Sequence, residues 1–451
     1  MTDVLVVGAA AGGLATAEAL RRRGFTGPIT VLGAEPHLPY DRPPLSKQVL
    51  AGEWAPERAR LRPVDATLHL GDPAVAFDAA ARRVTTAAGR IFEAESVVLA
   101  TGARPRRLPG TPEAYALRSL DEALSLRAAL LPGRRLVVVG DGVLGTEIAA
   151  TATKLGVDVT LAGPQPAPMH LQLGPVVAGL LADLHTRGGV RLRLGSGVTG
   201  LVPADIAPDA GVAGRPPAAV APGVGLVARP PAAVAPGVGL VARPPAAVAP
   251  GAGVAGSPPA AVGVTLASGE TLPADVVVVA FGAAPATEWL QGSGLTLDDG
   301  VVCDEQCRAA DGVWAVGDVA RWHHPGLGAS IRLENRTNAV EQADAVAANI
   351  LGAARPYAPI PYFWTEQFGV RIHLYGFPGG DLEVIEGDPA AGRFVAAYHR
   401  AGRPVGVLGW NMPKQARLHK SVLSFEEGKN RDDLPDDQGE GLPVRSAARA
   451  G

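Results

Sequence analysis

The chain has 451 residues, enough for two or three domains with full cores, and 47% of them are hydrophobic. Its formal net charge of −3 gives no general attraction to nucleic acid or to an acidic membrane surface. We find no signal-peptide pattern, no uninterrupted apolar run of about 18 residues and only two cysteines, so we expect a cytoplasmic protein that does not cross a membrane.

The first predicted element is a strand, turn and helix. Val4–Val7 is an apolar run typical of a strand, and residues 14–23 are rich in Ala, Leu and Arg, as in a helix. Three glycines lie in the turn between them: Gly8, Gly12 and Gly13. A second strand is expected at 29–32, followed by Glu35. Such a turn brings backbone N–H groups to a pyrophosphate, and an acid after the second strand binds a ribose hydroxyl, so the pattern predicts a dinucleotide site.

A proline-rich stretch, PYDRPPLSK at 39–47, comes next. Its three prolines fix much of the backbone, which suits a loop over a cofactor, although composition alone also allows a surface turn. A buried strand is expected at 97–100, and Thr101 and Gly102 would close the first half-domain. Residues 117–130 have the composition of a helix that opens a second unit.

That second unit repeats the dinucleotide pattern. A strand is expected at 136–139, and GDGVLGTEIAA follows at 140–150 with glycine at all three turn positions: Gly140, Gly142 and Gly145. Its second strand, at 158–161, leads to Gly163, where an acid is usual. Two such units on one chain imply two dinucleotides and electron transfer between them.

The segment from about 203 to 262 interrupts this pattern. PPAAV recurs there at 216, 230, 244 and 258 in a background of Gly, Ala, Val and Arg. We expect a disordered insertion in a hairpin, because its prolines favour extended, solvated backbone and the repeat has no core-forming period. A site for readers of polyproline is a second interpretation. A hairpin and a buried strand are expected at 263–280.

The last third of the chain contains a further strand and helix, followed by a separate domain. Residues 312–320 read as a strand and turn that contain Asp318, and 338–352 as a helix. From residue 361, aromatic and apolar segments alternate as in an antiparallel sheet. The acidic tail beyond 424 is expected to be disordered.

Three motifs together resemble the FAD-dependent NAD(P)H:ferredoxin reductases of the putidaredoxin reductase and rhodocoxin reductase type, which have the pyridine nucleotide-disulfide oxidoreductase fold. They are PYDRPPLSK, VVLATGARPRRLPG at 97–110 and VWAVGDVARW at 313–322. The likeness covers about 3–200 and 262–423. It implies a flavoprotein that passes electrons from NADH or NADPH through FAD to a [2Fe-2S] ferredoxin, which serves a cytochrome P450 or a ring-hydroxylating dioxygenase.

The expected fold class is α/β, with two Rossmann-like dinucleotide-binding domains and a C-terminal α+β domain that has an antiparallel sheet. The expected limits are 1–112 with 282–325 for FAD, 113–281 for NAD(P)H, 326–424 for the C-terminal domain and 425–451 for the tail. Nothing in the sequence gives the oligomeric state, and neither nucleic acid nor a membrane is expected as a partner.

The resemblance also implies roles for single residues. Lys47 and Glu147 would pair beside flavin N5 as the catalytic residues, where the lysine favours the reduced, anionic flavin. The remaining residues on the flavin side are Gly8, Gly12, Gly13, Glu35, Arg42, Thr101, Gly102, Arg118, Asp318, Arg336 and Trp364. Those on the nicotinamide side are Gly140, Gly142, Gly145, Glu147 and Gly163.

The residue types exclude other chemistry. A disulfide reductase of this plan needs a cysteine pair near 38–50, and the only cysteines are Cys303 and Cys307, which we interpret as structural thiols. Two cysteines do not hold an iron–sulfur cluster, so the ferredoxin must be a separate protein. His323 and His324 read as a polar turn without a third ligand, so no metal is expected. An NAD(P)H oxidase and a redox-switched, partner-binding flavoprotein like apoptosis-inducing factor remain as alternatives.

Three positions depart from the family pattern. Ala10 replaces the second glycine of the first turn, Arg336 stands where an aromatic residue is common, and Gly163 lacks the ribose-binding acid. Because Gly163 neither binds the ribose nor repels a 2′-phosphate, we expect NADH and NADPH to be used within about tenfold of each other. Lys414, Arg417 and Lys420, with Arg336, are candidates for a basic surface that binds an acidic ferredoxin.

Overall fold

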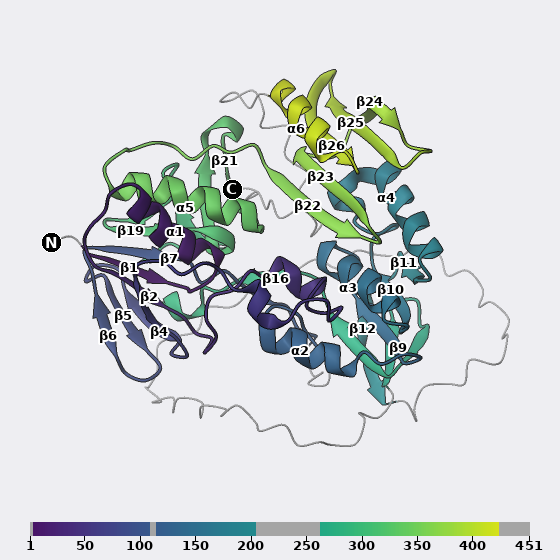
Figure 1. Cartoon of the computed structure of the whole chain (residues 1–451), viewed down its shortest axis with the longest axis horizontal. Coiled ribbons are helices and arrows are strands. Elements are labelled where there is room, and N and C mark those ends of the chain that lie inside the picture. The colour runs from purple at the N-terminus through teal and green to yellow at the C-terminus, as the bar shows by residue number, and fades with distance from the viewer. Residues whose placement is uncertain (1–2, 109–113, 204–261, 424–451) are drawn as a thin grey trace, which may run out of the picture.

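The computed structural model describes residues 3–108, 114–203 and 262–423, which form two α/β lobes and a third domain built mainly from strands (Figure 1). The predicted disordered insertion and acidic tail lie outside these ranges, apart from the ends of the insertion. Within the described ranges, no helix combines the length and the apolar character needed to cross a membrane. The α/β fold class with a C-terminal antiparallel sheet is confirmed.

The first lobe contains a six-stranded sheet in the order β18-β19-β7-β1-β2-β3. Its strands are parallel except for the β18–β19 pair. Their bounds are β1 (Val4–Val7), β2 (Ile29–Leu32), β3 (Thr67–His69), β7 (Ser96–Leu99), β18 (Arg308–Ala310) and β19 (Val313–Ala315). All four residues of β1 are buried, as expected for a central parallel strand covered on both faces.

Helices α1 (Ala11–Arg22) and α5 (Arg336–Ile350) pack against each other beside this sheet (Figure 1). Val346 and Ala347 of α5 belong to the same buried cluster as the strands. The domain limits stay a proposal, and this packing favours a boundary nearer residue 360 than residue 326. Two small sheets complete the lobe: β4 (Ala74–Asp78), β5 (Arg83–Thr86) and β6 (Ile91–Glu93); and β17 (Val301–Cys303), β20 (Ala320–His324) and β21 (Ala329–Ile331).

The second lobe repeats this plan with a four-stranded parallel sheet in the order β11-β10-β9-β15. The strands are β9 (Arg135–Val139), β10 (Asp158–Gly163), β11 (Arg191–Leu194) and β15 (Val276–Val279), and the helices are α2 (Leu120–Ala129), α3 (Val143–Lys154) and α4 (His170–Arg187). Between β11 and β15 the chain forms an antiparallel sheet of β12 (Val198–Pro203), β13 (Val262–Leu266) and β14 (Thr271–Ala274). The ends of the predicted insertion, residues 203 and 262, are therefore paired strand residues.

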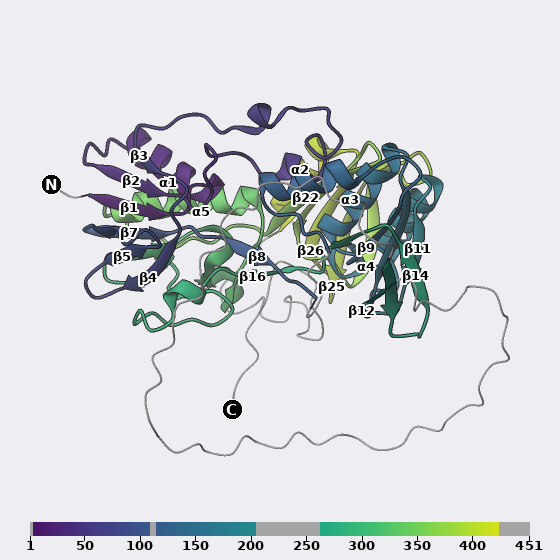
Figure 2. The same ribbon diagram turned by 90° about the horizontal axis from the view of Figure 1, so that it is seen from below.

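The chain crosses between the lobes twice. The two crossings, β8 (Ala103–Pro105) and β16 (Ala283–Pro285), form an antiparallel pair that lies between the lobes (Figure 2). Beyond the second crossing the chain completes the first lobe. The residues that follow β1 and β7 in the first sheet, and β9 and β15 in the second, line one shared space. Ligands of open α/β sheets bind at such carboxyl ends of the strands.

The third domain is a five-stranded antiparallel sheet in the order β22-β23-β26-β25-β24, followed by helix α6 (Pro413–His419). Its strands are β22 (Tyr362–Gln367), β23 (Val370–Gly376), β24 (Asp381–Asp388), β25 (Arg393–Arg400) and β26 (Arg403–Trp410). One face packs on α4, where Leu173, Val177 and Leu181 meet Phe363 and Leu374. Strand β22 also contacts α3 (Figure 1), so this sheet closes one side of the shared space.

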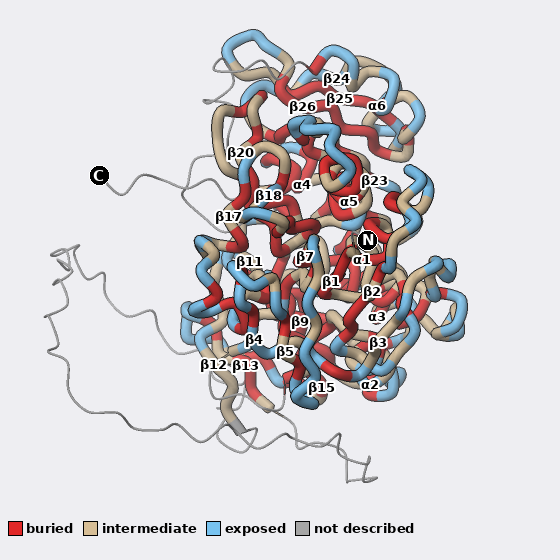
Figure 3. The backbone as a smooth tube through the Cα atoms, turned by 90° about the vertical axis from the view of Figure 1, so that its left-hand side faces the viewer, coloured by how far each residue is buried: buried red, intermediate tan, exposed pale blue. Residues whose placement is uncertain are grey.

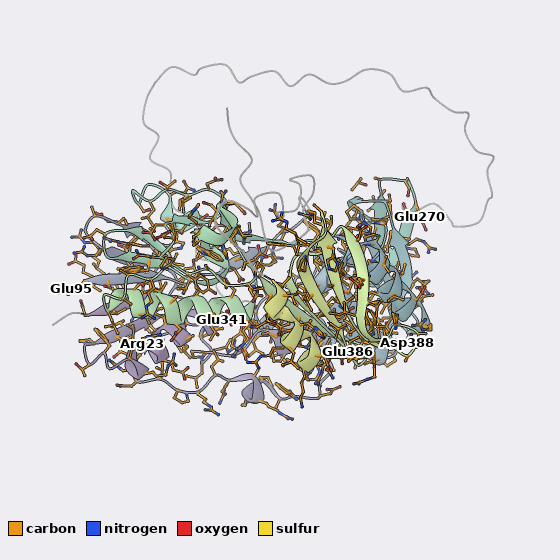
Figure 4. The ribbon with its side chains drawn as sticks, turned by 90° about the horizontal axis from the view of Figure 1, so that it is seen from above. Arg23, Glu95, Glu270, Glu341, Glu386 and Asp388 are labelled. Carbon is orange, nitrogen blue, oxygen red and sulfur yellow. The ribbon has the colours of Figure 1, made fainter. Side chains whose placement is uncertain are left out.

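Most expected elements form, and Figure 3 shows their buried residues along the strands of both lobes. The helix expected at 117–130 begins instead at Leu120, because Ser119 and Glu122 form a capping box there. The interpretation of His323 and His324 as a turn is wrong: both lie in β20, and His324 is buried with Nε2 2.8 Å from the Pro359 oxygen. The acidic edge strand β24, which contains Glu386 and Asp388 (Figure 4), was not expected; its alternation of Leu382 and Val384 with acids is short and ends at a bulge between Val384 and Glu386.

Candidate active site

The two glycine turns have nearly the same backbone geometry. Their first residues have positive φ, 126° at Gly8 and 123° at Gly140, which glycine adopts without a steric cost. A Cβ on either would lie within 2.5 Å of a carbonyl oxygen, that of Ala100 or of Ala280. Both turns therefore need glycine for a backbone reason that is independent of any ligand.

The third glycine of each turn allows the helix to approach the strand. A Cβ on Gly13 would lie 1.9 Å from the Gly8 oxygen, and one on Gly145 would lie 1.8 Å from the Gly140 oxygen. The second position is different, because Ala10 and Gly142 are the N-caps of α1 and α3 with extended backbone (φ −121° and −80°). Any residue adopts that conformation, which explains why alanine replaces glycine in the first turn.

Both turns open into one cavity of about 740 Å³. Its wall contains eleven of the predicted site residues: Gly12, Arg42, Lys47, Gly102, Arg118, Gly140, Gly142, Glu147, Asp318, Arg336 and Trp364. The other six do not line it: Gly8, Gly13, Glu35, Thr101, Gly145 and Gly163. Four of these six are glycines, three of which shape the turns rather than contact the cavity.

On the side of the first lobe, charged residues are fixed in pairs around the α1 N-terminus. Arg118 donates to Asp318 over 2.7 Å, and a Cβ on Gly102 would lie 3.2 Å from the Arg118 guanidinium. Glu35 accepts from Arg42 over 2.8 Å and from the Tyr40 hydroxyl over 2.5 Å. Glu35 therefore acts on the cavity through Arg42. A helix N-terminus beside basic side chains has the donors that a pyrophosphate needs.

Two further residues of this side were not singled out from the sequence. Arg332 is buried between Asp299 and Glu334, and both Arg332 and Glu334 line the cavity. Burial raises the pKa of the Glu334 carboxyl, and the adjacent guanidinium of Arg332 acts against that shift. Their sequence context, SIRLENR, contains no motif, and only the fold brings them to the cavity.

At the junction of the lobes, Lys47 and Glu147 form a buried ion pair with Nζ and Oε2 2.6 Å apart. Lys47 ends the proline-rich stretch, which forms the short 3₁₀ helix η1 (Pro43–Ser46), and Glu147 lies on α3 of the second lobe. The Lys47 ammonium also lies 5.2 Å from the centre of the Trp364 ring, within cation–π range. Glu147 of α3 and Trp364 of β22 thus meet at Lys47, whose neighbours Leu45 and Val49 pack in the buried cluster of the second lobe.

The carboxylate of Glu147 is fully held. Ser46 donates to its Oε2 over 2.6 Å, and Thr365 of β22 donates to its Oε1 over 2.7 Å. Gln367 continues the network by donating to Thr365 and to Thr146. Because buried charges are stable only when paired and hydrogen-bonded, this arrangement keeps the Lys47 ammonium at one place in the cavity.

On the side of the second lobe, the cavity is lined by Asp141, Pro164 and Gln165 rather than by Gly163. Asp141 is an acid inside the glycine turn, next to the strand end that lacks one. The sequence carries this signal as GDG, but the acid was not recognised as a candidate. Arg336, expected on the flavin side, lines the cavity and pairs with Asp41 over 2.5 Å.

The two cysteines lie away from the cavity in the core of the first lobe. Burial raises the pKa of the Cys307 thiol to about 12 and that of the Cys303 thiol well above its ordinary value. Gln342 donates to the Cys307 sulfur over 3.2 Å. Buried thiols of this kind are not nucleophiles at neutral pH. This placement agrees with their interpretation as structural residues.

Comparison with protein families gives two matches. The model of the pyridine nucleotide-disulphide oxidoreductase family matches residues 2–213 and 247–343, and that of the reductase C-terminal family matches 362–440. The first covers both lobes and the second covers the antiparallel domain.

Relatives match over nearly the whole chain. Rhodocoxin reductase of Rhodococcus erythropolis is 33% identical over 436 residues, which cover 94% of this chain and 90% of the relative. The ferredoxin–NAD(+) reductase component of the anthranilate 1,2-dioxygenase system of Burkholderia cepacia is 33% identical over 433 residues, 93% of each chain. Among solved structures, the covalent putidaredoxin reductase–putidaredoxin complex matches with a TM-score of 0.77 and 28% identity, over 94% of this chain and 93% of that one.

Proposed function

The chain belongs to the pyridine nucleotide-disulphide oxidoreductase family, and we propose that it is a reductase that passes electrons from NAD(P)H through FAD to a [2Fe-2S] ferredoxin. That ferredoxin supplies a cytochrome P450 or a ring-hydroxylating dioxygenase. The observation that carries the proposal is the single cavity shared by two glycine turns. Two dinucleotides bound to those turns extend toward the same space, where Lys47 and Glu147 meet.

The first turn and its surroundings fit FAD. The free N–H groups at the start of α1 and the guanidinium groups of Arg42 and Arg118 suit the pyrophosphate, and Asp318 suits a hydroxyl-bearing chain. When bound, FAD accepts a hydride from NAD(P)H and releases the electrons singly. The second turn, at the start of α3, would hold the nicotinamide dinucleotide.

The ion pair has a positioning and electrostatic role in this proposal. Its carboxylate is held by Ser46 and Thr365, so the Lys47 ammonium keeps a fixed position in the cavity wall. A fixed positive charge lowers the energy of negative charge that arrives with a hydride, without reorganisation during the reaction. Trp364 would wall the same part of the cavity.

The cysteines argue against a disulfide as the electron acceptor. A disulfide substrate requires a reactive cysteine, whereas both cysteines of this chain are buried in the first core. The relatives support a ferredoxin: two are named as reductases of rhodocoxin and of a ferredoxin, and a similar solved structure contains putidaredoxin bound to its reductase. We also propose a cytoplasmic location, which suits a protein with two free thiols.

Steady-state reduction of cytochrome c by NADH or NADPH tests the proposal. We expect FAD to copurify with the protein and the rate to rise strongly when a [2Fe-2S] ferredoxin is added. Fast oxygen consumption without ferredoxin would instead identify an oxidase. A rate independent of ferredoxin, with slow oxygen consumption, would favour a redox-switched binding protein.

A further inference from the structure

The side chain of Asp141 occupies the space beside Gly163. A Cβ placed on Gly163 would lie 2.2 Å from the Asp141 Oδ2 atom, 2.4 Å from its Cγ and 2.8 Å from its Cβ. These distances leave no room for a side chain at 163 while Asp141 keeps its conformation. The missing acid at the end of β10 is therefore matched by an acid of the glycine turn that fills the same volume.

The Asp141 carboxylate is built into this position. Gln165 donates to it twice, from its backbone N–H over 2.8 Å and from Nε2 over 2.7 Å. The Gln165 side chain is itself fixed, because its Oε1 accepts from the Leu171 N–H over 2.8 Å. Burial raises the pKa of the Asp141 carboxyl, and the two hydrogen bonds from Gln165 act against that shift by favouring the charged form.

Asp141 is only 4% exposed, yet it belongs to the lining of the cavity. Asp141, Pro164 and Gln165 all line the cavity, between the turn that begins α3 and the carboxyl end of β10. In a dinucleotide-binding unit, the adenosine ribose lies at this strand end. Each carboxylate oxygen accepts one bond from Gln165 and retains a second acceptor site, which is available to a ribose hydroxyl.

We propose that Asp141 selects NADH over NADPH by accepting hydrogen bonds from the adenosine ribose and repelling a 2′-phosphate. The inference rests on the proposed function and specifies its electron donor. It replaces the expectation that NADH and NADPH are used within about tenfold of each other, which rested on Gly163 and its neighbours Pro164, Gln165 and Pro166. A carboxylate at this point has the effect of the usual acid after the second strand, although it comes from a different segment.

Among the residues that the structure describes, the basic groups near this point do not offset it. By register, the nearest is Arg193 of β11, which is paired with Ala162 and whose guanidinium binds Glu270 over 3.0 Å (Glu270 is labelled in Figure 4). Most basic side chains of the cavity wall are in ion pairs elsewhere in the cavity, and Arg106 donates to the Ala283 oxygen at the β8–β16 crossing, beyond β15. In the sheet order, β15 lies on the opposite side of β9 from β10.

Binding of NAD⁺ and NADP⁺ to the oxidised, FAD-loaded protein, measured by titration calorimetry without ferredoxin, tests the inference directly. We expect the wild type to bind NAD⁺ about a hundredfold more tightly, because a charge-assisted hydrogen bond is replaced by repulsion when the 2′-phosphate is present. Asp141→Asn keeps the size of the side chain and removes its charge. It should lower the NAD⁺/NADP⁺ ratio about tenfold or more, chiefly by tighter NADP⁺ binding.

Two further variants separate a specific effect from a structural one. Asp158→Asn makes the same change at the other end of β10, outside the cavity wall, and should leave the ratio as in the wild type. Asp141→Gly combined with Gly163→Glu removes the clash and returns the acid to the strand end, so it should restore NAD⁺ selection. Gly163→Glu alone should instead displace Asp141 and weaken both nucleotides.

Equal affinities of the wild type for NAD⁺ and NADP⁺, or an unchanged ratio in Asp141→Asn, would overturn the inference. Stopped-flow reduction of the flavin distinguishes this from failure of the proposed function. If neither NADH nor NADPH reduces the FAD, the proposed function is wrong, while the binding ratio still decides whether Asp141 reads the 2′ position.

Discussion

The two dinucleotide units of this chain agree where the backbone is crowded and differ where a side chain meets the ligand. Gly8 and Gly140 share a positive φ, and Gly13 and Gly145 would place a Cβ within 2 Å of a carbonyl oxygen. At the second turn position the first unit has alanine and the second has glycine, both in extended backbone. The required glycines are those whose Cβ would meet backbone.

The acids differ more than the glycines. In the first unit, Glu35 follows the second strand and is held by Tyr40 and Arg42. In the second unit the strand end is Gly163, and the acid Asp141 enters from the turn. A ligand requires a carboxylate at a place in space, which more than one backbone position can supply, whereas close packing requires glycine at one position only.

The largest expected effect comes from breaking each turn separately. Gly13→Ala forces a methyl group onto the Gly8 oxygen and should weaken FAD binding about a hundredfold, the loss that corresponds to overpacking of about 3 kcal/mol. Gly145→Ala should leave FAD bound and abolish flavin reduction by NADH. Flavin absorbance of the purified protein and stopped-flow reduction measure the two effects.

Gly179→Ala in α4 is the matched control, because its Cβ would meet nothing within 4 Å and Gly179 does not line the cavity. This variant should keep its FAD. If Gly13→Ala also retained full FAD, the first turn would tolerate a shift of α1, and the comparison between the turns would not hold for function.

Lys47→Met tests the link between the units. Because the Lys47 ammonium is the partner of Glu147 and lines the cavity, its loss should slow flavin reduction by about tenfold or more, or about 1.4 kcal/mol of transition-state stabilisation. Lys154→Met makes the same substitution at the exposed end of α3 and should reduce at the wild-type rate. Reduction of Lys47→Met at the wild-type rate would show that the lysine only joins the domains.

The order of the elements and both turns could be predicted from the sequence, because apolar runs and glycine spacing are local signals. Lys47 and Glu147, expected as a pair from resemblance, do form an ion pair in the structure. The contribution of Arg332 and Glu334 could not be predicted, because it depends on how the chain returns to the first lobe after β16.

Asp141 was missed for a different physical reason. The usual pattern has its acid at the end of the second strand, and a contact between a turn side chain and that strand end is not a local property of the sequence. His324 shows the same limit: two adjacent histidines look polar, yet β20 buries His324 against the backbone of Pro359.

The glycine turns do not determine where ferredoxin binds. Substitutions in the candidate ferredoxin-binding surface, which contains Lys414, Arg417 and Lys420, should have a moderate effect. Lys414 and Arg417 are exposed on α6, and Leu418 beside them is 75% exposed. Lys420 interacts with Glu341 of α5 (labelled in Figure 4): its charge acts against the burial that raises the pKa of the Glu341 carboxyl. Lys414→Glu with Arg417→Glu should raise the KM for an acidic ferredoxin by about five- to tenfold and flatten its salt dependence.

Arg62→Glu serves as the control for this surface. Arg62 is exposed on the loop before β3, the edge strand of the first sheet, and its reversal should change neither the KM nor the salt profile. An unchanged salt profile in the Lys414 and Arg417 double variant would show that ferredoxin binds elsewhere, whereas flavin reduction by NADH should be the same in all of these variants.

The smallest effect is expected from shortening a hairpin connection, which is where the two units differ most in length. In the first unit, the hairpin between β4 and β5 closes with the short loop Ala79–Arg82, while in the second unit residues 204–261 lie between the paired residues Pro203 and Val262. Because these two residues are already cross-strand partners, an Asn-Gly turn can replace 204–261 without moving either strand.

Loop-closure entropy depends only logarithmically on length, so the change in unfolding free energy should be on the order of 1 kcal/mol or less. The shortened protein should keep its FAD and its rate of reduction by NADH, measured beside the full chain in a thermal melt and by stopped flow. If it lost FAD or became insoluble, the repeats would be required for the second unit to fold, and the two hairpins would not be equivalent.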